Sequence, residues 1–362
     1  MSTTPVRQLL VTFDRALPDK QLADIRNNLS AVVSAGGHLW LGGDEGTFLD
    51  RLTPDSTGTA FGQHRRFDLA SILTLPAAAS KTEIDIEGID FDSGFLWVIG
   101  SHSLKRKKAD PSEAPAKNRQ HLAKIETELN RHTLARIPLD GEGQLVAQTG
   151  TLRAARLESD ETGDALFHAL LNDGMLSPFC TIPSKDNGLD IEGLAVRGNR
   201  VFAGLRGPVL RGWAVVLELE CKDAQAQGSL ALARPVKKHF LQLEGLGVRD
   251  LTIRGTDLFI LAGPTMDLDG PSFVFRWAKA LEASDEALLF RKELTKVLKV
   301  PHGQGADHAE GIALLSPGEA LICYDSPAAA RLVEGHPEQV RLDVFELSGK
   351  DIDSTAGPIG IS

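Results

Sequence analysis

The string DIEGLAV at Asp190–Val196 decides the fold, because the chain returns to it. DIEGI at Asp85–Ile89 is nearly the same string, and HAEGI at His308–Ile312 is a third copy. Each copy is followed by a turn and then by a second short apolar run. Short apolar runs that recur at a fixed spacing indicate a repeat architecture.

Two weaker copies appear in the same frame, GVRDLTI at Gly247–Ile253 and NLSAVV at Asn28–Val33. The steps between successive copies are 57, 105, 57 and 61 residues, and 105 is almost two steps. Basic and helical insertions at about 103–131 and 158–175 explain the long step without an additional repeat. A sixth, degenerate repeat within residues 134–182 is the alternative. The position of Glu192 is held, in chain order, by Ser30, Glu87, Glu192, Arg249 and Glu310.

Short strands separated by turns surround each copy, and the third repeat shows four of them. Four antiparallel strands per repeat are typical of a β-propeller blade. The sequence therefore predicts an all-β fold, a single β-propeller domain over residues 1–362 with four-stranded blades and helical insertions. Five blades are the main interpretation, and six are the alternative.

Several elements can be placed on this frame. Arg7–Phe13 precedes the first repeat, and we expect it to pair with Val340–Leu347 and so remove the exposed edges of the ring. Phe67–Leu73 is predicted as the outer strand of the first repeat. Apolar residues at helical spacing predict helices over Asn118–Arg131 and Asp160–Asn172.

Composition limits the class of protein. With 42% hydrophobic and 24% charged residues the chain is globular, and its net charge of -10 argues against binding to nucleic acid or acidic membranes. No window approaches the roughly 18 apolar residues of a membrane span. The first residues read as a strand rather than a targeting signal, so we expect a cytoplasmic protein. Cys180, Cys221 and Cys323 are far apart, which favours buried free thiols over a zinc site.

The repeat also predicts a site. The first strand of each propeller blade lies nearest the axis, so the five Glu192-type positions should converge at one mouth of the central channel. The second strand runs back, and the residues after it should emerge at the same mouth. Asp85 and Asp190, two positions before their glutamates, would lie beside them. Residues predicted to follow the second strands include Asp44, His102, Arg206 and Asp325.

Two interpretations of this cluster stay open. In the first, Arg249 pairs with the glutamates in a structural network, and the glycine after each glutamate permits close backbone packing. In the second, Glu87, Glu192 and Glu310 hold a hard cation, Ca²⁺ or Mg²⁺, because clustered carboxylates repel unless a positive charge lies between them.

The D-x-E-G-[LI] string followed by a hairpin resembles the motif of calcium-dependent β-propeller phytases and phytase-like esterase proteins. Over its whole length the chain is similar to a bacterial family of uncharacterised propellers, domain of unknown function 3616. The phytase resemblance implies calcium-bound carboxylates at the mouth that bind phosphate and activate water. It implies metal ligation by Glu87, Glu192 and Glu310, and phosphate contacts from Arg206 and Arg249. In two repeats, Ser30 and Arg249 depart from the pattern.

The first functional hypothesis is a metal-dependent hydrolase of a phosphoester or related ester. The alternative is a non-catalytic propeller that binds a small anionic ligand or a partner protein at the mouth. The basic run Lys105–Lys108 reads as a solvated loop that could close over an anion. For the hydrolase, the candidate residues are Glu192 and His102 for catalysis, Arg206, Arg249, Asp44 and Asp325 for the ligand, and Glu87, Glu192, Glu310, Asp85 and Asp190 for the metal.

Overall fold

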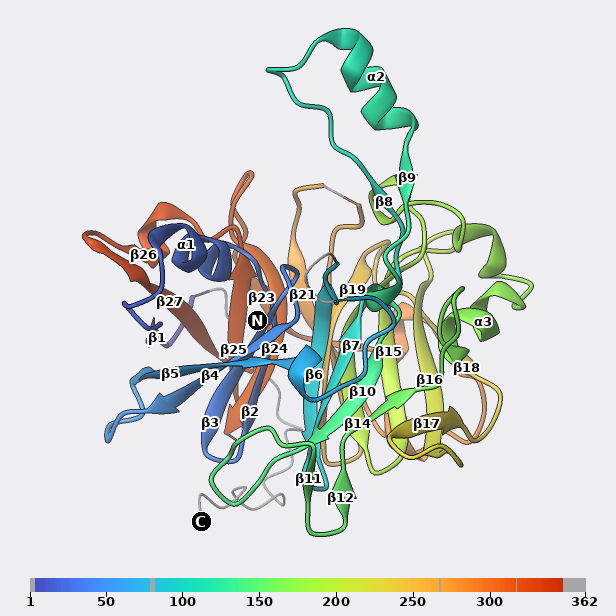
Figure 1. Ribbon diagram of the computed structural model, residues 1–362, viewed down its shortest axis with the longest axis horizontal. Helices are drawn as coiled ribbons and strands as arrows, with labels where there is room; N and C mark the ends of the chain where they lie inside the picture. Colours follow the sequence, from blue (N-terminus) through green and yellow to red (C-terminus); the bar gives the residue numbers. More distant parts are fainter. Residues whose placement is uncertain (1–3, 79–81, 267, 317, 348–362) are drawn as a thin grey trace.

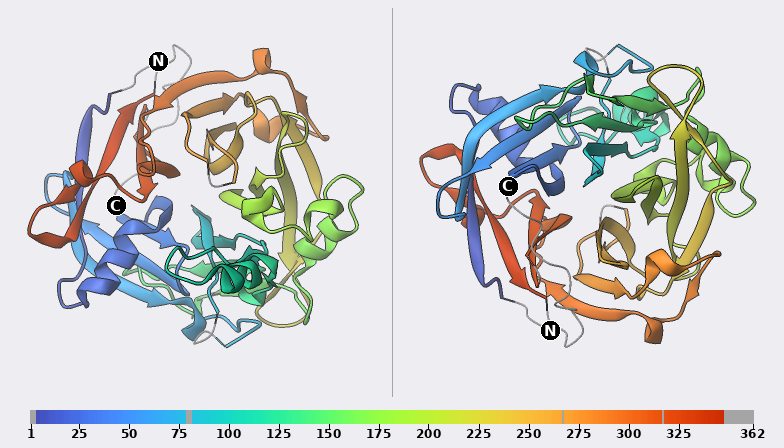
Figure 2. Two further views of the ribbon diagram at one scale, coloured as in Figure 1. Left: turned by 90° about the horizontal axis from the view of Figure 1, so that it is seen from above. Right: turned by 90° about the horizontal axis from the view of Figure 1, so that it is seen from below.

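The computed structural model describes residues 4–78, 82–266, 268–316 and 318–347. Figure 2 shows its sheets arranged in a ring around a central axis, and the same ring is seen from the side in Figure 1. The protein is a β-propeller, as the repeat predicts.

Strand pairing within these ranges gives five antiparallel units, which we number as blades 1 to 5. In each unit the first strand begins at a copy of the repeat. The strands run in the following order from the axis outward: β2 (Leu29–Ala35), β3 (His38–Gly43), β4 (Phe48–Pro54) and β5 (Ala60–Asp68) in blade 1; β6 (Ile86–Asp92), β7 (Phe95–Gly100), β10 (Leu134–Pro138) and β13 (Ala155–Leu157) in blade 2; β14 (Asp190–Arg197), β15 (Arg200–Gly207), β16 (Ala214–Asp223) and β18 (Lys237–Leu241) in blade 3; β19 (Gly247–Arg254), β20 (Asp257–Gly263), β21 (Ser272–Trp277) and β23 (Thr295–Val300) in blade 4; and β24 (His308–Ser316), β25 (Glu319–Asp325), β27 (His336–Glu346) and β1 (Arg7–Thr12) in blade 5.

The two ends of the chain meet in blade 5. β1 pairs antiparallel with β27, in a register that runs from Arg7 opposite Val344 to Thr12 opposite Gln339. β1 also pairs in parallel with β5 of blade 1 at Leu10 and Val11. The predicted pairing of the terminal strands is therefore confirmed, and it covers edges that would otherwise be open to another chain.

The core lies between neighbouring blades. Each central strand is covered on both faces, so it reads as a continuous apolar run rather than an alternating one. In β7 every residue from Phe95 to Gly100 is buried. Between blades 1 and 2, for example, Trp40 packs in one cluster with Ile86 and Val98. The three cysteines are free and buried, as predicted.

The helices in the two insertions differ from their predicted bounds. The first insertion contains α2 (Pro115–Ala123), which begins with proline in its first turn and ends before β9 (Ile125–Glu126) pairs with β8 (Lys105–Arg106). The helix predicted over Asn118–Arg131 was thus placed too late, because Ile125–Glu126 pairs with β8 in an extended form and Leu129–Arg131 forms a separate 3₁₀ turn. The second contains α3 (Ala165–Leu171), whose N-cap Asp164 accepts a hydrogen bond from Phe167 N.

The predicted outer strand Phe67–Leu73 was also wrong in its bounds. β5 ends at Asp68, and Leu69–Ser71 forms a 3₁₀ turn capped by the Asp68 side chain. Residues 134–182 provide β10, β13 and α3, and these strands are the outer part of blade 2. None of the described helices is long and apolar enough to cross a membrane. The remaining elements are α1 (Asp19–Asn27), β11 (Gln148–Thr149), β12 (Leu152–Arg153), β17 (Ser229–Leu232), β22 (Leu288–Leu289), β26 (Leu332–Val333) and the 3₁₀ turns Leu129–Arg131, Ser177–Phe179, Ser184–Asp186, Ala280–Glu282, Arg291–Glu293 and Ala329–Arg331.

Candidate functional site at the channel mouth

The inner strand of every blade breaks register at the repeated position. Pairing with the second strand jumps over that residue in all five units, and in blade 3 it also jumps over Gly193. A β-bulge leaves its extra residue unpaired and redirects the side chain. The repeat in the sequence is therefore a structural repeat of bulges. The bulged residues are Ser30, Glu87, Glu192, Arg249 and Glu310.

The glycine after two of these bulges allows neighbouring inner strands to approach closely. A Cβ atom on Gly88 would lie 2.7 Å from Leu194 N of blade 3. Gly193 has φ +87°, and a Cβ there would lie 2.5 Å from Asp250 Cα of blade 4. Any larger residue would push two blades apart, so close packing near the axis explains these glycines.

Side chains also join the inner strands. Ser30 Oγ donates a hydrogen bond to Ile86 O of the next blade. Asp250 Oδ2 accepts one from Ile312 N at 2.7 Å, and Asp90 Oδ2 accepts one from Val196 N at 2.6 Å. Burial raises the pKa of Asp90 to about 7, and the hydrogen bonds that Asp90 accepts from Val196 N and Phe91 N oppose the shift.

Two arginines connect the acidic residues of blades 3 to 5. Arg206, near the end of β15, donates from Nε to Asp190 Oδ2 at 2.6 Å, and its Nη1 lies 2.8 Å from Glu192 Oε1. Arg249 Nε lies 3.1 Å from Glu192 Oε2, and its Nη2 pairs with Glu310 Oε1. Glu192 is only 2% exposed, so it is a buried carboxylate held between two guanidinium groups.

The charges in this network compensate one another. Burial would lower the pKa of Arg206, but Asp190 and Glu192 outweigh it and raise that pKa. Burial lowers the pKa of Arg249, and Glu192 opposes the shift. Burial raises the pKa of Glu192, while the two arginines lower it. The cluster is thus a buried salt-bridge network, in which each charge depends on its partners.

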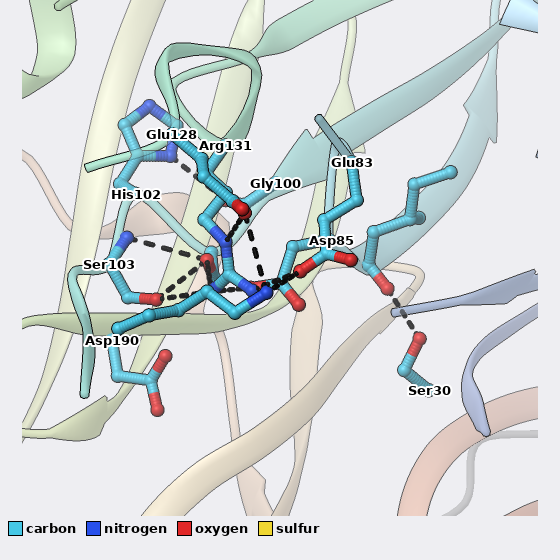
Figure 3. A network of polar contacts seen from close by, with 12 residues as sticks. Ser30, Glu83, Asp85, Gly100, His102, Ser103, Glu128, Arg131 and Asp190 are labelled. Carbon is cyan, nitrogen blue, oxygen red and sulfur yellow. Dashed lines mark hydrogen bonds and ion pairs between the residues drawn. The ribbon is translucent and has the colours of Figure 1, made fainter. Parts of the chain in front are cut away.

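A second network surrounds Arg131, which comes from the first insertion (Figure 3). Its Nη1 lies 2.5 Å from Asp85 Oδ2, its Nη2 lies 2.5 Å from Glu83 Oε1, and its Nε lies 3.0 Å from Glu128 Oε2. Nη1 also donates to Ser103 Oγ at 2.9 Å. Sequence reasoning missed Arg131, because the residue lies outside the repeats and carries no positional signal.

The structure places His102 inside the protein rather than facing the mouth. The residue is 1% exposed, its Nε2 lies 2.9 Å from Asp164 Oδ2, and its Nδ1 lies 2.8 Å from Gly100 O. Burial opposes ionisation, but Asp164 raises the pKa of the imidazole. Both ring nitrogens are occupied by protein atoms, so this histidine ties β7 to the N-terminus of α3. That position leaves the predicted general base without access to a ligand.

Two acidic side chains at the mouth form no ion pair with the residues that the structure describes. The Glu87 side chain also has no hydrogen bond among them; burial and Glu192 raise its pKa well above the usual value, and the charge of Arg206 opposes the shift. Asp44 Oδ1 is buried without a hydrogen bond among those residues. Burial, with the negative charges of Asp85 and Asp325, raises the pKa of Asp44 to about 7.

An open cleft lies at the mouth between blades 3, 4 and 5, with about 470 Å³ of empty space that includes part of the surrounding solvent. Lys185 is exposed at its edge and has no ion pair within the described ranges. His308 Nε2 lies 2.9 Å from Asp269 Oδ1, and hydrogen bonding to Asp325 is the main cause of its raised pKa. The charged residues that line the cleft are Lys185, Arg206, Arg249, His308, Glu310 and Asp325, with Asp307 and His302 beside them.

The metal hypothesis meets a geometric obstacle. Among residues 4–78, 82–266, 268–316 and 318–347, no group of three or more His, Cys, Asp or Glu side chains is placed to hold a metal ion. Of the predicted ligands, Asp85, Asp190, Glu192 and Glu310 each pair with an arginine, and Glu87 is the exception. Calcium requires six to eight oxygen ligands, so these carboxylates would first have to leave their arginines.

Comparison with known proteins identifies the family of this chain. The sequence profile of the family described as "Protein of unknown function (DUF3616)" matches residues 28–343. No curated protein matches the chain. Among solved structures, it is similar to a glutaminyl cyclase of Myxococcus xanthus, with 11% identity, coverage of 95% of this chain and 100% of that one, and a TM-score of 0.39. It is also similar to a streptogramin B lyase, with 8% identity, coverage of 95% and 100%, and a TM-score of 0.34. The Dos1 propeller is similar at 11% identity, with coverage of 82% and 55% and a TM-score of 0.29.

Proposed function

We propose that this protein, which belongs to the family of proteins of unknown function DUF3616, is a ligand-binding propeller that takes a small anionic molecule into the cleft at its channel mouth. The observation that carries the proposal is the position of Lys185. It is an exposed cation without an ion pair in the described ranges, and it lines the same cleft as the buried Arg249.

The arginines give this cleft a fixed positive wall. Arg249 holds Glu192 with Nε and Glu310 with Nη2, which prevents its guanidinium group from turning away. Burial and the nearby Arg206 both lower the pKa of Arg249, so an anion in the cleft would relieve an unfavourable environment. A preorganised cation of this kind favours charge-assisted hydrogen bonds to a carboxylate or phosphate.

The cleft also carries acceptors. Glu310, Asp307 and Asp325 line the same cleft and would repel a bare anion. A ligand that also bears hydroxyl groups could donate hydrogen bonds to these carboxylates while its charged group faces Lys185 and Arg249. The cleft therefore fits a hydroxylated anion, such as a sugar phosphate or a hydroxy acid, better than a simple inorganic one.

Calorimetric titration with glucose 6-phosphate, citrate and inorganic phosphate tests this function. We expect binding of a hydroxylated anion, weakened at least about tenfold in Lys185→Ala, because one charged hydrogen bond contributes about 1.5–3 kcal/mol. Lys222→Ala is the matched control, since Lys222 is an exposed lysine on the outer part of blade 3. Equal affinities of the two variants, or no binding of any of the three anions, would contradict the proposal.

A metal-dependent hydrolase is the second candidate, and the unpaired carboxyls of Glu87 and Asp44 favour it. If Ca²⁺ or Mg²⁺ binds there, the ion would supply an activated water for a phosphoester or related ester. Calorimetry with either ion on chelator-treated protein tests this candidate. The hydrolase predicts metal binding that is lost in Glu87→Gln, and turnover that is lost in Glu192→Gln. Absence of metal binding to the wild-type protein would remove it.

A further inference from the structure

The first insertion forms an arm that leaves the ring at the mouth. We define the arm as residues 105–126, which contain β8, α2 and β9. Figure 1 shows α2 at the far end of the arm, away from the blades. α2 has nine residues and none of them is buried. A helix of this length is marginal in water without packing, so the arm lacks the contacts that normally keep such a helix folded.

The root of the arm is nevertheless firmly held. Lys105 Nζ lies 2.5 Å from Glu83 Oε1, and Arg106 Nε lies 2.6 Å from Asp186 Oδ2. Leu104 O accepts a hydrogen bond from Ser184 N of the segment before blade 3. These contacts direct the arm outward beside the Arg131 network, so the arm does not fold back over its own mouth (Figure 1).

The arm differs in charge from the rest of the protein. It carries seven Lys and Arg residues against three Asp and Glu, a net charge of +4. The whole chain has a net charge of -10, so the remainder carries -14. Two apolar side chains near the end of α2 are also exposed, Leu122 at 48% and Ile125 at 45%. A basic, partly apolar element on an acidic protein is suited to an acidic protein surface.

We propose that the arm docks on the mouth face of a second copy of this chain, in a two-fold symmetric dimer. The mouth supplies the complementary charge beside blade 1, because Glu45 is exposed there and the charges that act on Asp44 come from other acidic residues, Asp85, Asp325, Glu45 and Glu83. A two-fold axis would let each arm reach the other mouth through the same contacts. A nucleic acid or an acidic membrane is disfavoured as the occupant, because the large negative charge of the body repels it.

Light scattering coupled to gel filtration tests this dimer. We expect the wild-type chain of 38.9 kDa to show twice that mass at low ionic strength. It should dissociate at about 1 M salt, where the screening length falls to about 3 Å. The arm variant Lys107→Glu/Lys108→Glu should raise the dimer dissociation constant at least about tenfold, and Leu122→Ser should raise it as well. These residues are exposed, so circular dichroism should show an unchanged fold.

Three further variants locate the contact. Lys222→Glu/Lys292→Glu makes the same charge change outside the arm and should leave the dimer intact. Glu45→Lys by itself should weaken the dimer. Combined with Lys107→Glu/Lys108→Glu it should restore the dimer, because the opposite charges again face each other. A wild-type chain that stays monomeric at low ionic strength would overturn the proposal and assign the arm to a different acidic protein. A dimer that resists the arm variants, or a combined variant without recovery, would overturn it too.

Discussion

Replacing Glu192 with glutamine tests whether the channel mouth is a structural salt-bridge network. Glu192 is 2% exposed and bridges Arg206 Nη1 at 2.8 Å and Arg249 Nε at 3.1 Å. Removing one member of a buried ion pair costs about 3–5 kcal/mol, because a charge is left without compensation. In the Glu192→Gln variant, Arg206 still pairs with Asp190 and Arg249 still pairs with Glu310. We therefore expect Glu192→Gln to lower the free energy of unfolding by about 3 kcal/mol, the lower limit of that range.

Urea unfolding measures this loss. The midpoint should fall while the slope of free energy against urea stays unchanged, since the exposed surface is the same. Glu220→Gln is the matched control, because Glu220 pairs with the exposed Arg234 at 3.1 Å and should contribute less than about 1 kcal/mol. In a double-mutant cycle, Glu192→Gln and Arg249→Met should show coupling of about 1 kcal/mol or more. A Glu192→Gln variant as stable as the control would refute the structural network.

Three other substitutions have defined outcomes. The Asp44 pKa of about 7 exceeds its value in the unfolded chain, so the contribution of Asp44 to stability is present below about pH 4 and is lost as the pH rises through 7. Asp44→Asn should therefore stabilise the protein by about 1–3 kcal/mol at pH 8 but not at pH 4, as measured by thermal unfolding. Gly193→Ala should cost at least about 3 kcal/mol from positive φ and overpacking, whereas Gly212→Ala, at φ +88° in open space, should cost about 1–2 kcal/mol in urea unfolding. The raised His308 pKa keeps a positive charge at the cleft, so anion affinity should fall as the pH rises through that pKa, and calorimetry on His308→Gln should show a flatter pH profile.

The sequence by itself determined the ring and the repeated positions on its inner strands. Hydrophobic runs and turns are local signals, so the five copies could be aligned without any knowledge of tertiary contacts. The alignment placed Ser30, Glu87 and Arg249 at equivalent positions, and the structure shows a bulge at each. The pairing of the terminal strands was also predictable, because a ring of blades must cover its two open edges.

Only the tertiary structure decided which charges meet. Arg206 could be placed at the mouth from its strand, but its contacts with Asp190 and Glu192 depend on the bulge geometry of blade 3. Arg131 reaches Asp85 from an insertion. Asp164 lies 62 residues after His102 in the chain and binds its imidazole inside the protein. The physical reason is that strand patterns depend on neighbouring residues, whereas ion pairing depends on distances between blades, which the packed core sets.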